Sequence, residues 1–118
     1  MKSKGILIDA EKRTVTEVEI SSLKDMYAAM RVDLITVGVQ LDVVNCIYVD
    51  DEGLLKSPEH FFFYEGAHQP FAGSGLVLGI NKRGATISTN LSLAEVKKSV
   101  KFLNPTGALI MARKLEGE

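Results

Sequence analysis

The residues with the clearest capacity for chemistry are two histidines and two glutamates in one short stretch. Glu59, His60, Glu65 and His68 fall within ten residues. Imidazole and carboxylate groups bind zinc and also serve as general acids and bases. Zinc needs three or four converging ligands, however, and this spacing matches no recurrent ligand pattern, so we expect no metal site.

The same residues are also the basis for an enzyme interpretation. A small hydrolase or nucleotide-acting enzyme would use His60 or His68 as its general base, with a carboxylate nearby. The chain contains no nucleophile motif such as G-x-S-x-G. The three acids at 50–52 precede Gly53, which is typical of a solvated turn. We therefore predict no catalytic residues and no cofactor, and keep the enzyme as an alternative.

Nucleic-acid and phosphate binding are poorly supported. The glycines Gly73 and Gly75 precede a strand rather than opening a helix, so the sequence lacks the context of a phosphate-binding loop. Lys97, Lys98 and Lys101 have no aromatic residue interleaved with them. The formal net charge of −1 gives no bulk attraction to nucleic acid. A weak nucleic-acid binder is the second alternative.

An aromatic cluster is the least ordinary feature of the chain. Five of the eight aromatic residues lie within the eleven positions 61–71. Alternate members could cover the open end of the core, as in an irregular edge strand, or some could form a ligand pocket or a self-association surface. The predicted binding surface comprises Glu59, His60, Phe61, Phe62, Phe63, Tyr64, Glu65, His68 and Phe71.

Length and composition indicate one domain spanning residues 1–118, with a polar tail from about residue 113. Hydrophobic residues make up 46% of the chain and charged residues 25%, an ordinary globular balance. Cys46 is the only cysteine, which excludes an intramolecular disulfide and favours a reducing compartment. No apolar run approaches the length of a membrane span. We expect a cytoplasmic protein that does not associate with membranes.

Charge is unevenly distributed along the chain. Residues 21–80 carry three basic and eight acidic groups, whereas residues 81–118 carry seven basic and three acidic groups. Such a bipolar molecule could form a homo-oligomer by head-to-tail contact or bind a charged partner.

The elements that must position these residues follow from periodicity and turn chemistry. A hairpin is expected from the apolar runs at 5–9 and 15–20, followed by a helix that Ser22 caps. Strands are expected at 34–41, 43–49, 75–81, 85–89 and 108–112, and a second helix, capped by Ser92, at 93–103. Residues 54–73 show no clear period and are expected to form a long loop.

The order ββαββ–loop–ββαβ indicates an α+β fold. We predict a mainly antiparallel sheet of about six or seven strands, with two short helices packed on one face.

Several stretches resemble a family of small proteins of unknown function that are encoded mainly by bacteriophages and conjugative elements. The resemblance rests on the acidic turn and following leucines of 48–55, the glycine-led strand of 75–81 and the helix opening of 91–96, and it covers roughly residues 5–103. It implies a phage or mobile-element accessory protein in a bacterial host cell. We expect such a protein to act without catalysis by binding a host protein, such as a defence factor or enzyme, or a small ligand.

Overall fold

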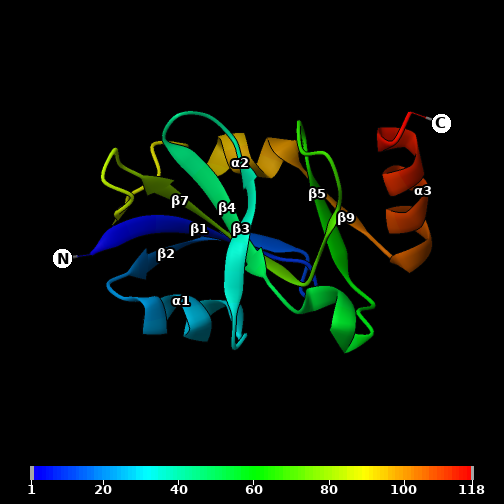
Figure 1. The fold of residues 1–118 in the computed structure, drawn as a ribbon, viewed down its shortest axis with the longest axis horizontal. Coiled ribbons are helices and arrows are strands. Elements are labelled where there is room, and N and C mark those ends of the chain that lie inside the picture. Colours follow the sequence, from blue (N-terminus) through cyan, green and yellow to red (C-terminus); the bar gives the residue numbers. More distant parts are fainter. Residues whose placement is uncertain (1, 118) are drawn as a thin grey trace.

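The computed structural model describes residues 2–117, which form two antiparallel sheets and several helices (Figure 1). The N-terminal half contains β1 (Ser3–Asp9), β2 (Thr14–Ile20), α1 (Leu23–Met30), β3 (Ile35–Gln40), β4 (Asn45–Asp50) and the 3-10 helix η1 (Gly53–Lys56). The C-terminal half contains β5 (Phe61–Tyr64), β6 (Phe71–Ala72), β7 (Ser74–Ile80), β8 (Thr86–Ile87), α2 (Leu93–Ser99), β9 (Val100–Leu103) and α3 (Pro105–Leu115).

The larger sheet has the strand order β2-β1-β7-β4-β3, with β8 paired to the end of β7. The smaller sheet has the order β6-β5-β9. All strand pairs among the described residues are antiparallel, so the α+β class and the predominantly antiparallel sheet are confirmed. None of the helices within residues 2–117 has the length and apolarity that crossing a membrane requires.

Side chains alternate across the larger sheet and build one core on each of its faces. On one face, Ile6 and Ile8 pack with the aromatic residues of β5 and with Val96 of α2. On the other face, Leu76 and Leu78 pack with Met26 and Met30 of α1. The two predicted helices therefore cover opposite faces, and their expected placement on one face is wrong.

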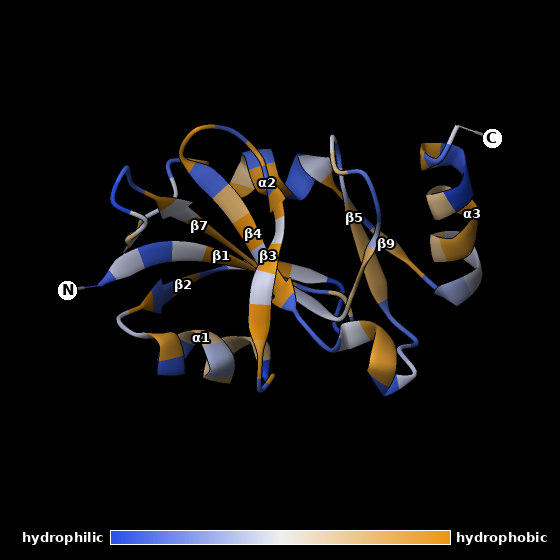
Figure 2. Ribbon diagram, in the orientation of Figure 1, coloured by the Kyte–Doolittle hydropathy of each residue, from blue (hydrophilic) through white to orange (hydrophobic). Residues whose placement is uncertain are grey.

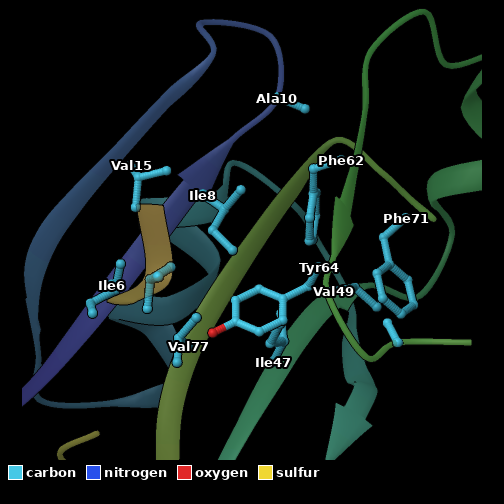
Figure 3. Close-up of a cluster of buried hydrophobic side chains, with 12 residues drawn as sticks. Ile6, Ile8, Ala10, Val15, Ile47, Val49, Phe62, Tyr64, Phe71 and Val77 are labelled. Atoms are coloured by element: carbon cyan, nitrogen blue, oxygen red, sulfur yellow. The ribbon is translucent and has the colours of Figure 1, made fainter. Parts of the chain in front are cut away.

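The predicted loop at 54–73 is a set of short elements, because it contains η1, β5 and β6. Phe62 and Phe71 are buried with ring centroids 5.6 Å apart, and they join the core beside Ile47 (Figure 3). A Cβ atom at Gly75 would lie 2.5 Å from the Phe62 ring, so only glycine lets β7 approach this aromatic strand so closely.

The C-terminal part differs most from expectation. Ser92 caps the second predicted helix and forms a capping box with Glu95, but the helix ends at Ser99 and residues 100–103 pair with β5 as β9. The predicted strand at 108–112 is instead the middle of α3. Asn104 caps this helix by accepting a hydrogen bond from the Gly107 N–H, and Pro105 occupies the first turn. The helix continues through Arg113, Lys114 and Leu115, the first residues of the predicted polar tail.

Candidate functional site

The aromatic residues of the predicted binding surface fall into a buried set and a half-buried set, because successive side chains of β5 point to opposite faces. Phe62, Tyr64 and Phe71 are 0%, 6% and 5% exposed, whereas Phe61 and Phe63 are half-buried. The interpretation in which alternate members cover the core is therefore the one that the structure supports. The three buried rings belong to the core, so they present little surface to a partner.

The polar members of the predicted surface are all exposed, but they do not lie together at one site. Glu59 and His60 line a pocket of about 310 Å³, whereas Glu65 and His68 do not. We call this cavity the Asp9–Asp50 pocket. Its lining residues are Asp9, Glu11, Met30, Arg31, Val32, Asp50, Gly53, Lys56, Pro58, Glu59, His60, Ala72, Gly73 and Ser74.

Three neighbouring strands place the pocket's central polar residues in one row. Asp9, the last residue of β1, lies opposite Ser74, the first residue of β7. Val49 lies opposite Gly75, which brings Asp50 at the end of β4 next to Ser74 on the other side. All three side chains lie on the sheet face that α1 covers, because residues two apart in a strand share a face.

Each aspartate in the row is paired with a cation. Arg31 Nη2 lies 3.1 Å from Asp9 Oδ2 and 3.4 Å from Glu11 Oε1, and Lys56 Nζ lies 2.7 Å from Asp50 Oδ2. The aspartate side chains are 7% exposed, whereas Arg31 and Lys56 are 54% and 45% exposed. The hydrogen bond to Asp50 raises the pKa of Lys56 above its ordinary value. The lysine therefore remains charged at neutral pH.

The second oxygen of each buried carboxylate accepts a backbone hydrogen bond. Asp9 Oδ1 lies 3.1 Å from the Lys12 nitrogen, and Asp50 Oδ1 lies 2.9 Å from the Glu52 nitrogen. All four carboxylate oxygens thus have a protein donor. This arrangement fixes the orientation of both side chains before any ligand arrives.

Ser74, between the two aspartates, is only 7% exposed and lines the pocket, and none of the side-chain hydrogen bonds found among residues 2–117 involves its hydroxyl. Within the same range, no fully buried side-chain nitrogen or oxygen lacks a partner. The Ser74 oxygen must therefore reach the open space of the pocket. It can donate one hydrogen bond and accept others from a bound molecule.

The backbone adopts a left-handed conformation at Arg31 and directly after Lys56. Arg31 caps the end of α1 with φ at 59°, and Ser57, which follows Lys56, has φ at 51°. Glycine is usually found in this left-handed region, and other residues cost of order 1 kcal/mol or more there.

The pocket lining carries a net negative charge. Four carboxylates and two cations line it, which gives a formal charge of −2 with His60 neutral. No group of three or more His, Cys, Asp or Glu side chains within residues 2–117 is arranged to hold a metal ion. The pocket lies at the lower end of the ~300–1,000 Å³ range of small-molecule sites.

Other residues considered in the sequence do not form a second site. Lys97 and Lys98 lie on α2, but Lys101 lies on β9, so the three lysines do not share one helix face. Cys46 is buried, and this burial raises the pKa of its thiol. It is an inert core residue rather than a nucleophile.

Sequence reasoning assigned Asp9 and Asp50 to a strand end and a turn, and it did not single out Arg31, Lys56 or Ser74 as site residues. The available signal was that two strands end in aspartate and a third begins with serine. Only the spatial order β1-β7-β4 makes those positions neighbours, and a single sequence does not give that order.

The family model described as Domain of unknown function (DUF3846) matches residues 1–101. Comparisons with curated proteins and with solved structures found no match. The matched region includes the whole larger sheet and every residue that lines the Asp9–Asp50 pocket, but it ends before α3. Because the match covers most of its length, the chain belongs to the family described as Domain of unknown function (DUF3846).

Proposed function

We propose that the protein acts without catalysis by binding a small polar ligand with a cationic group in the Asp9–Asp50 pocket. The observation that carries this proposal is the unpartnered Ser74 hydroxyl, held inside the pocket between two oriented carboxylates. A buried hydroxyl with no protein partner is costly unless water or a ligand satisfies it.

The electrostatics of the pocket support a cationic group over an anionic one. The lining carries an excess of two negative charges, because four carboxylates (Asp9, Glu11, Asp50 and Glu59) outnumber the two cations, Arg31 and Lys56. Glu59 lines the pocket and forms no ion pair among the described residues. A ligand ammonium or guanidinium group would meet the Ser74 oxygen and this carboxylate.

The biological setting is part of the proposal. The stretches that carry the resemblance to phage and conjugative-element proteins include Gly53 and Asp50 of the acidic turn, and both line the pocket. Gly75, the first residue of the glycine-led stretch, follows Ser74, the first residue of β7. We infer a phage or mobile-element accessory protein that works in the cytoplasm of the host cell by capturing a small molecule.

A hydrolase with His60 as its general base is the second candidate, because His60 lies at the same pocket as the Ser74 hydroxyl. The two functions differ in outcome, since a binding protein leaves its ligand unchanged. Incubation of the protein with each bound probe, followed by mass spectrometry of the probe, separates them. If the wild-type protein converts a probe and His60→Gln does not, the protein is an enzyme and the proposed binding function is wrong.

The direct test is a calorimetric titration with four probes: spermidine, free arginine, adenosine monophosphate and glucose. We expect saturable binding of spermidine or arginine and none of the nucleotide. Ser74→Val removes the hydroxyl and fills part of the pocket, so it should abolish that binding. The matched control is Ser3→Val, a strand serine at the opposite end of β1 from Asp9. Absence of binding to every probe, or equal binding by the Ser74 variant, would contradict the proposal.

A further inference from the structure

The outward surface of α3 is apolar in its middle and basic at its end. Leu109 and Ile110 are 54% and 51% exposed, although α3 packs on β5 and β9 through its other side. Arg113 and Lys114 follow four residues later in the helix, so they lie on the same surface. We call these four residues the basic helix face.

A second exposed surface has the opposite charge. Leu54 and Leu55 of η1 are 72% and 82% exposed, and Val37 on the edge strand β3 is 44% exposed. These residues line a groove of about 440 Å³, and the exposed Asp51 lies beside them in its wall. Glu52 follows Asp51 in the chain. We call Val37, Asp51, Leu54 and Leu55 the acidic leucine patch.

We propose that the basic helix face of one copy binds the acidic leucine patch of a second copy. Each surface offers adjacent large apolar residues that water would otherwise surround, and each places its charges next to them. The helix supplies Arg113 and Lys114, while the patch supplies Asp51 with Glu52 beside it. Apolar surfaces that fit each other give an interface affinity, and opposite charges beside them fix how the two partners are oriented.

The positions of the two surfaces favour a closed dimer. Both η1 and α3 lie in the half of the molecule that contains the smaller sheet (Figure 1). Apolar residues stand out on both elements in Figure 2. A two-fold axis beside this half lets each copy bind the other's patch with its own helix. Two reciprocal contacts then bury twice the area of one contact and leave neither surface exposed.

Sedimentation velocity over a range of protein concentrations tests this inference without any ligand. The wild-type protein should shift from monomer to dimer as concentration rises, and added salt should weaken the dimer because charge pairs contribute. Leu55→Ser and Ile110→Ser should each raise the dissociation constant by about tenfold or more. Val43→Ser is the matched control. Val43 is 95% exposed in the β3–β4 connection, outside both surfaces, and its replacement should leave the dimer unchanged.

Mixing the two variants gives the sharper result. A Leu55→Ser copy keeps its helix face and an Ile110→Ser copy keeps its patch, so a mixed dimer regains one intact contact that neither homodimer has. We expect the mixture to associate more tightly than either variant alone. A monomeric wild-type protein, an equal loss in Val43→Ser, or no gain on mixing would each overturn the inference.

Discussion

The strands β4 and β7 carry a polar cluster at each end, and the two clusters differ in how completely their hydrogen bonds are used. At one end, Asn45 is fully buried, and its side-chain nitrogen donates to Asp42 and Asn90 at 3.0 Å and 2.6 Å. Its side-chain oxygen accepts from the Thr89 hydroxyl at 2.6 Å and from the Asn90 backbone at 3.2 Å. At the other end, Ser74 lines the pocket, and its hydroxyl takes part in none of the side-chain hydrogen bonds described for residues 2–117.

This difference separates a structural site from a candidate ligand site. The Asn45 amide uses both its donors and both its acceptor positions within the protein, so it has nothing to offer a ligand. It ties the β3–β4 connection to the segment that precedes α2. The Ser74 hydroxyl has unused capacity at the edge of a pocket, so stability should depend on Asn45 and binding on Ser74.

Replacing Asn45 should have the largest effect on stability. Asn45→Ala leaves the buried Thr89 hydroxyl and the groups of Asp42 and Asn90 without their shared partner, at a cost of about 3 kcal/mol in unfolding free energy. Urea denaturation measures this loss. Asn81→Ala is the control, because the Asn81 side chain accepts two backbone hydrogen bonds in an exposed turn. A loss no larger than that of the control would remove the structural role assigned to Asn45.

Acid should weaken the Asn45 cluster through Asp42. Hydrogen bonds from the Asn45 side chain, and then from the Asn45 and Val44 backbone, lower the pKa of Asp42 from its ordinary value of 3.8. Asp42 therefore stabilises the fold fully above pH 3.8, and this contribution is lost as pH falls through the lowered value. The difference in unfolding free energy between the wild-type protein and Asp42→Asn should narrow in that acidic window. A difference that stays constant with pH would contradict this assignment.

Ser74→Ala should have the smallest effect on stability, changing the unfolding free energy by less than about 0.5 kcal/mol. The hydroxyl has no protein partner to lose, and alanine fits the same strand position. Urea denaturation of Ser74→Ala and Asn45→Ala under the same conditions compares their losses of unfolding free energy directly. A loss above about 1 kcal/mol would mean that the hydroxyl bonds within the protein, and the contrast between the two ends would fail.

Local signals in the sequence were sufficient for several elements. The caps at Ser22 and Ser92 involve neighbours in the chain, and the structure contains both. The run at 100–103 continued the helical period, but its pairing with β5 draws it into a sheet. Because β5 lies some 40 positions earlier in the chain, neighbouring residues alone could not indicate that 100–103 would pair as a strand instead of continuing the helix. Asn104 and Pro105 begin α3, and they follow β9 rather than the end of α2.

The candidate site was only partly predictable. Glu59 and His60 were expected within a binding surface, and both line the pocket. The aromatic rings that drew attention to the same segment instead fill the core beneath it. Periodicity can identify a buried strand, but it cannot show which of several strands will lie beside another.

The central position of β7 has a consequence for how the molecule assembles. β1 pairs with β7 across about 70 residues of chain, and β4 joins β7 from the other side. During synthesis, β1 and β4 must wait for β7 with unpaired edges exposed, a topology that favours slow folding and exposes the nascent chain to aggregation. The row Asp9, Ser74 and Asp50 forms only when this last central strand is inserted. Ligand binding would therefore report completed folding, and no fragment that lacks β7 would bind.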